Sequence, residues 1–357
     1  MNVLIQLSHP AHYHLFKHTA RELIDHGHHV HILIKTKDVL EELLKSSGLP
    51  YINILPVAHR HSKVGIALDM LIRDWRILRY VLRHRIDILV GSTPEVAQVG
   101  WLTHRHRINF GEDDAAVVPL YFKTVRPFAQ CLLAPVSCNN GDLESRTVHY
   151  PGYHKLAYLH PNRFTPDRNV VSRYFDPSEP YFLIRFAQLT AHHDTGIHGF
   201  TPQVAQQLIQ RLTPHGHVFI TSERPLEHEL EPYRLKIDPA DIHHIMAFAT
   251  MYIGDSQSMA VEAAMLGVPG IRFNDFAGRI GVLEELEHTY RLTVGIPTSQ
   301  PEQMLALVDE WLSDLDLRAT FAERRQRMLA DKIDVTAYFT WFIEHYPESR
   351  TSVWTSR

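Results

Sequence analysis

The first part of the chain alternates short apolar runs with amphipathic stretches. Stretches with apolar residues at helical spacing occupy 13–26, 39–45 and 66–84, and a further helix is expected to begin after Pro94. The apolar runs predict buried strands at 3–7, 30–34, 51–55, 86–90 and 107–110. Strands that alternate with helices are typical of parallel β-α-β units. Ligands of such sheets bind at the carboxyl ends of the strands, where this sequence places the polar loops 8–12, 91–95 and 111–114.

The alternation breaks near residue 150 and then resumes. Residues 150–177 are irregular and rich in proline and tyrosine, which indicates a linker into a second domain. The pattern beyond it predicts strands at 181–186, 217–221, 251–253 and 270–273, with helices at 202–212, 239–248 and 258–266. We therefore predict a first domain over 1–155 and a second over 156–332, with a C-terminal helix at about 333–357 that packs back on the first.

Composition narrows the class of protein. The 357 residues include 36 Lys and Arg against 40 Asp and Glu, a formal net charge of −4, which argues against a dedicated nucleic-acid binder. Two cysteines are too few for a disulfide framework, so a cytoplasmic location is expected. We expect neither a signal peptide nor a transmembrane helix, because there is no basic leader and no apolar run of about 18 residues. The 26 histidines are scattered along the chain and do not indicate one metal site.

The strongest site signal lies in the segment 252–269, with the sequence YIGDSQSMAVEAAMLGVP. A strand ends in Gly-Asp-Ser, and a helix is expected to begin directly after Asp255 and Ser256. The unpaired N–H groups and the dipole of a helix N-terminus favour phosphate binding. Ser258 adds a second hydroxyl, and Glu262, about one turn inside the helix, could accept hydrogen bonds from two ribose hydroxyls. The alternative is that Asp255 and Ser256 only cap the helix.

Besides that segment, several stretches carry a resemblance to a known family. They are SHPAHYHLFK at 8–17, YPGY at 150–153 with YLHP at 158–161, RF at 185–186 with AHHD at 191–194 and Gly196, RFN at 272–274, and GRIGVLEEL at 278–286. Together they resemble a GT-B-like family, domain-of-unknown-function family 354, over residue 3 to about 300. The segment around Asp255 also resembles the Asp-Ser-Gly-Gly…Glu-Glu stretch of non-hydrolysing UDP-N-acetylglucosamine 2-epimerases and the nucleotide-sugar motif of GT-B glycosyltransferases.

The resemblance implies an α/β fold of two Rossmann-like domains facing a cleft. It implies that the second domain holds a nucleotide-diphosphate sugar and the first holds the acceptor. By position, Ser256, Gln257 and Ser258 would meet the diphosphate and Glu262 the ribose. The epimerases have two glycines where this chain has Gln257 and Ser258, and side chains there narrow the approach to the phosphates. The resemblance implies no cofactor and no metal ion.

The loop after the first strand supplies the first catalytic candidate. In inverting GT-B transferases a histidine after this strand faces the acceptor, and His12 occupies the matching place, beside Ser8 and His9 as substrate-binding candidates. An imidazole that titrates near pH 6.5 suits a general base for a sugar hydroxyl. The alternative is that these are ordinary loop residues of a histidine-rich chain. His14 and His18 have a metal-ligand spacing, but no third ligand accompanies them.

The acidic run Glu112-Asp113-Asp114 supplies the second candidate. Three adjacent carboxylates at a strand end repel one another, so a compensating or functional use is expected. The epimerases carry a catalytic glutamate in this region; Glu112 matches it most closely, and Asp113 is included as a catalytic candidate. A solvated turn and a divalent-ion site are the alternatives.

Cationic candidates follow the strands of the second domain, where the epimerases place residues that face the diphosphate. An ordinary ion pair is the alternative for each arginine. The candidates are Arg185, His192, His193, Arg272 and Arg279.

The helix that includes Arg73–Arg85 is basic, amphipathic and rich in aromatic residues. It could contact an anionic membrane surface peripherally, as suits a lipid-linked acceptor at the inner membrane face, or simply pack on the sheet with a solvated basic face.

We therefore expect a metal-independent GT-B-type glycosyltransferase that moves a sugar from a nucleotide-diphosphate donor, with UDP the expected nucleotide, to a cell-surface glycan or lipid-linked precursor. In this hypothesis His12 or Glu112 deprotonates the acceptor. The alternatives are an isomerase like the UDP-sugar 2-epimerases and a non-catalytic protein that binds a sugar nucleotide. Walker and dinucleotide glycine loops are absent from the sequence, which disfavours kinases and NAD enzymes.

Overall fold

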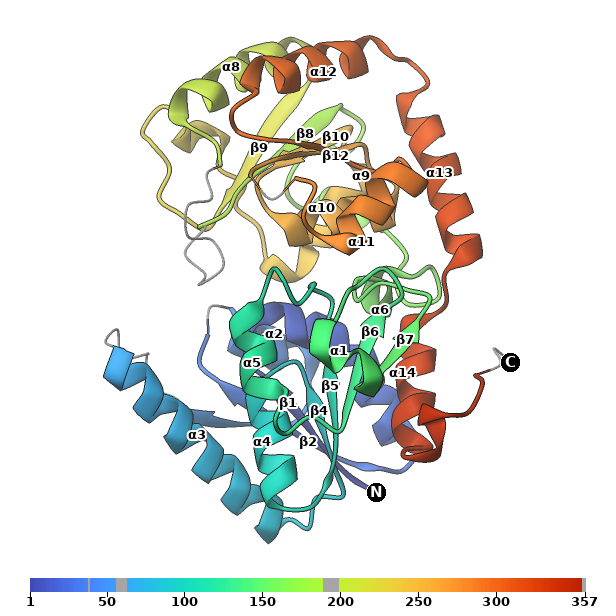
Figure 1. Cartoon of the computed structure of the whole chain (residues 1–357). Helices are drawn as coiled ribbons and strands as arrows, with labels where there is room; N and C mark the ends of the chain where they lie inside the picture. The colour runs from blue at the N-terminus through green and yellow to red at the C-terminus, as the bar shows by residue number, and fades with distance from the viewer. Residues whose placement is uncertain (38, 56–62, 189–198, 276, 355–357) are drawn as a thin grey trace. The chain divides into compact units, whose positions relative to one another are not determined.

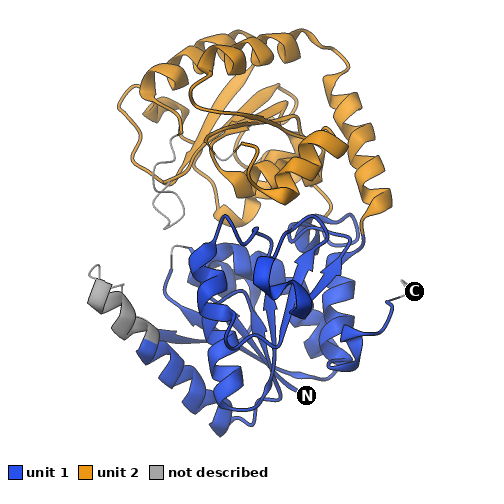
Figure 2. Cartoon of the chain, viewed as in Figure 1, with its two compact units in different colours: residues 1–163, 333–357 blue, residues 164–332 orange. Residues whose placement is uncertain are grey.

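The chain folds into two compact α/β units. The computed structural model describes residues 1–37, 39–55, 63–188, 199–275 and 277–354, with the backbone alone for 63–70. Unit 1 comprises residues 1–163 and 333–357, and unit 2 comprises residues 164–332 (Figure 2). The boundary lies at 163/164 and not at the predicted 155/156, because the short helix α6, Leu156–Leu159, contacts α1, Pro10–Asp25, of unit 1.

Unit 1 is built on a parallel sheet of seven strands in the order β3-β2-β1-β4-β5-β6-β7 (Figure 1). β1 pairs in register with β2 on one side and β4 on the other, so the first strand of the chain lies inside the sheet. The strands are β1 Asn2–Leu7, β2 His29–Lys35, β3 Tyr51–Leu55, β4 Ile88–Gly91, β5 His106–Phe110, β6 Cys131–Pro135 and β7 Thr147–Tyr150.

Helices cover this sheet in two groups. α1 contacts α2, α6 and α14, whereas α3 contacts α4 and α4 contacts α5. Leu4, Leu33 and Leu89 of the strands are fully buried against Ile77 and Val81 of α3, and this cluster fixes that helix on the sheet. The remaining helices of unit 1 are α2 Leu40–Ser47, α3 Lys63–Arg83, α4 Pro94–Leu102, α5 Pro119–Val125 and α14 Val335–Glu344, with 3₁₀ turns η1 Gly141–Arg146 and η6 Glu348–Arg350.

The chain returns to unit 1 through α14. The Thr336 hydroxyl donates to the carbonyl of Ala157 at 2.6 Å, and the Phe339 ring lies 4.7 Å from that of Phe110 on β5. Phe339 is fully buried. A helix from the end of the sequence therefore completes the core of the first sheet.

Unit 2 has a five-stranded parallel sheet in the order β12-β11-β10-β8-β9. Thr201 caps α8 by accepting the Val204 N–H, as its place before Pro202 predicts. The strands are β8 Tyr181–Phe186, β9 His217–Ser222, β10 Met251–Gly254, β11 Gly270–Phe273 and β12 Val294–Ile296. The helices are α7 Arg168–Val171, α8 Pro202–Leu212, α9 Ile242–Phe248, α10 Gln257–Leu266, α11 Gly281–Glu284, α12 Pro301–Ser313 and α13 Leu317–Asp331, with a π-helical turn η5 at Glu285–Thr289 and 3₁₀ turns η2 Thr213–His215, η3 Glu231–Tyr233 and η4 Pro239–Asp241.

The prediction of two Rossmann-like α/β domains is confirmed, and most predicted elements lie within a few residues of the observed ones. Three strands were not predicted. β7 and β12 are short edge strands with a weak apolar pattern, whereas β6 is a buried apolar run that the pattern alone could have revealed. The helix predicted at 239–248 is a 3₁₀ turn followed by α9. Among the described residues, no helix has both the length and the apolar character needed to cross a membrane.

Candidate functional site

The carboxyl ends of the unit 1 strands gather a group of ionisable side chains around His12. His9 ends the loop after β1 and caps α1, where its Nδ1 accepts the Ala11 N–H at 3.2 Å. One turn later, the Nδ1 of His12 accepts the backbone N–H of Ser8 at 3.3 Å, and the Ser8 Oγ lies 3.5 Å from the same nitrogen. The proposed loop residues Ser8, His9 and His12 therefore lie together, with His9 exposed and His12 half-buried.

The protonation of His12 follows from its surroundings. Burial, together with the charges of His9, His154, Lys35 and Lys155, lowers the pKa of His12 to about 3. The ring is neutral at pH 7. Because a backbone N–H only donates, Nδ1 carries no proton in this arrangement, and the proton of the neutral ring lies on Nε2. In this state His12 is a hydrogen-bond donor through Nε2.

Glu112 follows β5 and is held from the segment after β7. Its carboxylate accepts the backbone N–H of His154 at 2.6 Å and the Lys155 ammonium at 2.5 Å. Burial by itself would raise the pKa of Glu112, but the charges of Lys155 and His154 and these hydrogen bonds outweigh it and lower the pKa. Glu112 is therefore an ionised, half-buried partner of Lys155. Asp113, next in sequence, is exposed.

Lys35, His154 and Lys155 belong to this group, and the sequence analysis missed them as site residues. Lys35 is the last residue of β2, and the other two follow β7, a strand that the apolar pattern did not reveal. Burial lowers the pKa of His154 to about 4, and its Nε2 is buried without a hydrogen-bond partner among the described residues. The position of Lys35 at a predicted strand end was the one available signal.

Taken together, the group holds the ammonium groups of Lys35 and Lys155, the Glu112 carboxylate, the neutral imidazoles of His12 and His154, and the exposed His9. The charges of Lys35 and Lys155 lower the pKa of His12, and Lys155 forms an ion pair with Glu112. This charge balance favours a negatively charged ligand, and the Nε2 of neutral His12 offers it a hydrogen-bond donor.

In unit 2, β10 leads directly into α10, as the sequence predicts. Asp255 lies at this junction and is 2% exposed. Its Oδ1 accepts the Ala187 N–H at 2.6 Å, and the backbone amide of Phe200 also donates to the carboxylate. Burial raises the pKa of Asp255 to about 6 although these amides lower it. The side chain joins the segment after β8 to the start of α10 and lies inside the fold.

Ser256 caps α10, since its Oγ accepts the Met259 N–H at 3.4 Å. Gln257 is the first helical residue, and both its Oε1 and its Nε2 are buried without a hydrogen-bond partner among the described residues. Ser258 is exposed. A helix N-terminus with an unpaired side-chain amide beside it is a group of donors suited to an anion.

Glu262 lies inside α10, 9% exposed, with its Oε1 3.2 Å from the Nε2 of His243 on α9. His243 is itself 4% exposed. No sequence motif predicts a role for His243, because this contact arises only where α9 and α10 pack.

The cationic candidates differ in their surroundings. Arg185 on β8 pairs with Glu223, and Arg224 donates to the carbonyl of Phe200 at 2.8 Å. Arg272 is fully buried and pairs with Glu287. Arg279 is exposed. His192 and His193 lie outside the described residues.

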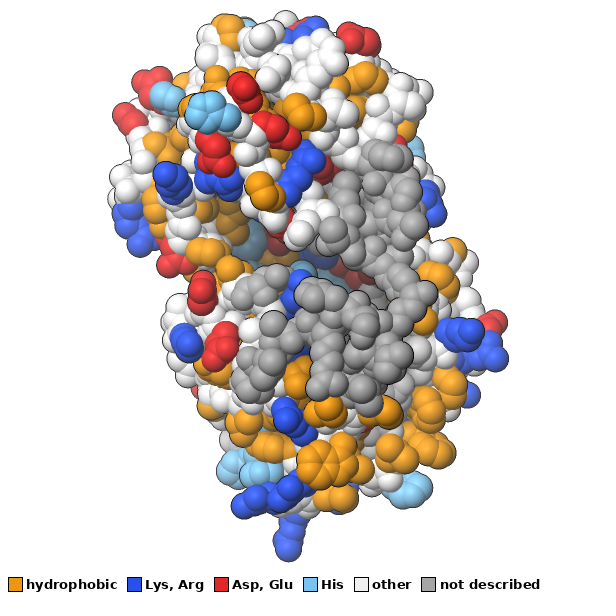
Figure 3. All heavy atoms as spheres, turned by 90° about the vertical axis from the view of Figure 1, so that its left-hand side faces the viewer, with side chains coloured by type: hydrophobic (Ala, Val, Ile, Leu, Met, Phe, Trp, Pro, Cys, Tyr) orange, Lys and Arg blue, Asp and Glu red, His pale blue; other side chains and the backbone are white. Residues whose placement is uncertain are grey.

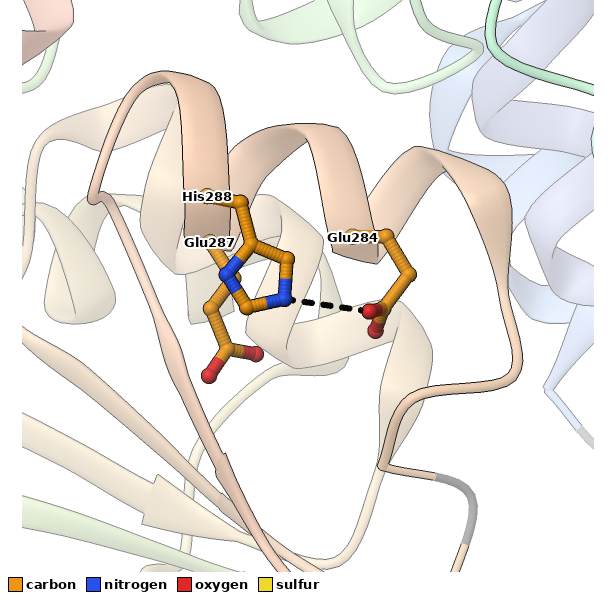
Figure 4. Close-up of side chains that lie close together, drawn as sticks. All are labelled: Glu284, Glu287 and His288. Atoms are coloured by element: carbon orange, nitrogen blue, oxygen red, sulfur yellow. Dashed lines mark hydrogen bonds and ion pairs between the residues drawn. The ribbon is translucent and has the colours of Figure 1, made fainter.

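Figure 4 shows Glu284, Glu287 and His288, a group whose ligand atoms are close enough to share a metal ion. The groups are already engaged. Glu287 accepts from Arg272 and from the N–H of Gly295, and the Nε2 of His288 lies 3.2 Å from a Glu284 oxygen. A cation would compete with the Arg272 guanidinium for the Glu287 carboxylate. We therefore interpret this group as the partner that compensates the charge of the buried arginine, and not as a metal site.

Comparison with known proteins gives matches in structure only. No family model and no curated protein matches the chain. S. aureus MnaA, solved with UDP, has a TM-score of 0.72 at 10% identity and covers 100% of this chain and 99% of its own. The UDP-GlcNAc 2-epimerase from Methanocaldococcus jannaschii has a TM-score of 0.63 at 13% identity, with 88% and 94% covered. The spinosyn rhamnosyltransferase SpnG, solved with thymidine diphosphate, has a TM-score of 0.65 at 14% identity, with 95% and 99% covered.

These matches extend over both units and define the class of fold. The chain has the two-domain GT-B-like architecture that UDP-GlcNAc 2-epimerases and GT-B glycosyltransferases share.

Proposed function

We propose that this chain binds a nucleotide-diphosphate sugar at the β10–α10 junction and transfers the sugar as a GT-B-type glycosyltransferase. The observation that carries the proposal is the start of α10, where a capped helix N-terminus lies beside the unpaired side-chain amide of Gln257. The first N–H groups of a helix have no carbonyl partner within it, and they bind phosphate together with the helix dipole. Neighbours of the same fold were solved with UDP and with thymidine diphosphate.

Around this junction we assign the diphosphate to Ser256, Gln257 and Ser258, and the ribose to Glu262. The Ser256 hydroxyl caps the helix as an acceptor and still has its own proton to donate. The Glu262 carboxylate can accept more than one hydrogen bond, and His243 at 3.2 Å orients it. Asp255 supports this site from inside through the backbone amides that it binds.

We assign the acceptor to the unit 1 group. Lys35 and Lys155 favour an acceptor that carries a negative charge, such as the phosphate of a lipid-linked precursor. An anion beside His12 raises the pKa of its imidazole and makes it a better base. To take a proton at Nε2, His12 must first move its own proton to Nδ1, which breaks the contact with the Ser8 N–H. Glu112 is the second candidate base and is held ionised by Lys155.

The donor assignment is tested by thermal shift with UDP, GDP, CMP and thymidine diphosphate and their sugars. A nucleotide at about 100 times its Kd should stabilise the protein by roughly 2.7 kcal/mol. Gln257→Leu and Glu262→Gln should each remove most of the shift. Glu302→Gln, at an exposed position of α12, is the matched control and should keep it. If none of the nucleotides stabilises the protein, the donor site is wrong.

A 2-epimerase-like isomerase is the second candidate, favoured by a TM-score of 0.69 to a UDP-N-acetylglucosamine 2-epimerase, against 0.65 to the rhamnosyltransferase SpnG. The two activities separate in one experiment, in which the protein is incubated in D₂O with UDP-N-acetylglucosamine and no acceptor. Transfer predicts an unchanged sugar by proton NMR. Deuterium at C2 of the sugar, or a second epimer, would show that the protein is an epimerase and would contradict glycosyl transfer.

A further inference from the structure

The outer face of α3 carries large apolar side chains that do not pack on the sheet. Leu71, Trp75 and Leu82 are 65%, 57% and 59% exposed, whereas Ile77 and Val81 of the same helix are buried. Spacings of four and seven residues place the three exposed side chains in one stripe along the helix. Packing on the sheet explains the buried face of α3 and leaves this stripe unexplained.

Arginines lie beside this stripe. Arg79 and Arg83 are exposed, and the Arg79 guanidinium lies 5.8 Å from the Trp75 ring centroid. Neither forms an ion pair with a carboxylate in the part of the chain that the structure describes. We call Leu71, Trp75, Arg79, Leu82 and Arg83 the α3 patch. Figure 3, which faces the α3 side, shows hydrophobic and basic side chains next to each other on the described surface of unit 1.

The other charged side chains that the structure describes on α3, over 71–83, lie elsewhere. Arg73 turns inward, 3.0 Å from Glu95 of α4, and Arg76 donates to the carbonyl of Ile54 on β3. Asp74 is half-buried. Arg85, just beyond the helix, is exposed and adds to the positive charge. Over the described residues of α3, the accessible charge of this face is therefore positive.

We propose that the α3 patch docks unit 1 on an anionic membrane surface. Leucine and tryptophan side chains enter the boundary between headgroups and acyl chains, and the arginine stems lie along it while the guanidinium groups bind lipid phosphates. A second copy of this chain suits the patch less well, because two arginine-bearing faces repel each other whereas an anionic bilayer attracts both. The proposal does not rest on the donor site in unit 2.

The test is co-sedimentation of the full-length protein with vesicles. Binding is expected with phosphatidylcholine vesicles that contain phosphatidylglycerol, weaker binding with phosphatidylcholine alone, and weaker binding as salt is raised. Two double variants probe the two components, L71S/W75S and R79E/R83E. Each lysine or arginine near such a surface contributes about 1 kcal/mol, so R79E/R83E should weaken binding at least tenfold.

Two controls are matched to these variants. Leu315→Ser removes an exposed apolar side chain of unit 2, and Arg126→Glu reverses an exposed charge elsewhere in unit 1; both should bind like the wild type. Circular dichroism checks that each variant is folded. Absence of binding to the anionic vesicles, or equal binding by the α3 variants and the controls, overturns the proposal. A wild-type dimer that L71S/W75S converts to a monomer in light scattering would assign the patch to self-association instead.

Discussion

At the scale of single residues, the chemistry of the candidate groups is set by neighbours that are distant in sequence. Glu112 and Lys155 are 43 residues apart, and their ion pair lowers the pKa of a half-buried carboxylate at a strand end. His12 is neutral because it shares a half-buried space with two histidines and two lysines. The sequence identified His12 and Glu112 as candidates, yet it contained no signal for His154 or Lys155 beside them.

The state of His12 is measurable by nitrogen-detected NMR on selectively labelled protein. Since its pKa is lowered to about 3, the ring should stay neutral as the pH falls from 7 to about 4, with the proton on Nε2. His26 is an internal control: its hydrogen bond to Glu344 raises its pKa, so it should titrate above the usual histidine range. Titration of His12 near pH 6.5 would show that the ring is not buried as described.

Asp255 predicts a pH-dependent component of stability. Its pKa is about 6 in the folded protein against 3.8 ordinarily, so the folded state binds this proton more tightly than the unfolded state does. The protonated carboxyl therefore favours folding below about pH 4, and this contribution is lost as the pH rises through 6.

Asp255→Asn isolates this component. In urea unfolding, the free energy of unfolding of the wild type should fall by up to about 3 kcal/mol relative to that of the variant as the pH rises from 4 to 7, since one pKa unit is worth about 1.4 kcal/mol. Parallel stability curves for the two proteins would rule out a raised pKa.

At the scale of elements, local sequence determined most helices and strands, and packing determined where they lie. The apolar runs of buried parallel strands and the caps at Thr201 and Gly267 are local signals. α14 is different. Its length and apolar face predict a helix, while its place in the core of unit 1 depends on the rings of Phe110 and Tyr150, far away in the chain.

Phe339→Ala tests the role of α14. Removing a fully buried ring from between β5 and the helix leaves a cavity and should cost about 3–5 kcal/mol of unfolding free energy. His345→Ala, at the exposed end of the same helix, should cost far less. The measurement is chemical denaturation of both variants; equal stabilities would mean that α14 is not part of the unit 1 core.

At the scale of the whole molecule, the chain has two separate cores, and its candidate groups belong to different units. A ligand of the β10–α10 junction therefore acts first on unit 2. Hydrogen exchange with the best nucleotide of the thermal-shift series should slow at residues 254–262 and stay unchanged in α3. If hydrogen exchange slowed only in unit 1, the donor site would have to lie in unit 1 and the assignment to unit 2 would be wrong.

The sequence by itself determined the two α/β domains, because strand and helix periodicities and caps are local properties. It also predicts an anion site at the β10–α10 junction, because the end of the strand at Gly254, the capping Ser256 and the start of the helix at Gln257 are adjacent in the sequence. Only the tertiary structure decided that Asp255 faces inward, that Glu262 meets His243, that Lys155 holds Glu112, and that Arg272 is buried beside Glu287. The physical reason is that charge state and burial depend on contacts between distant segments, which the order of residues along one element does not specify.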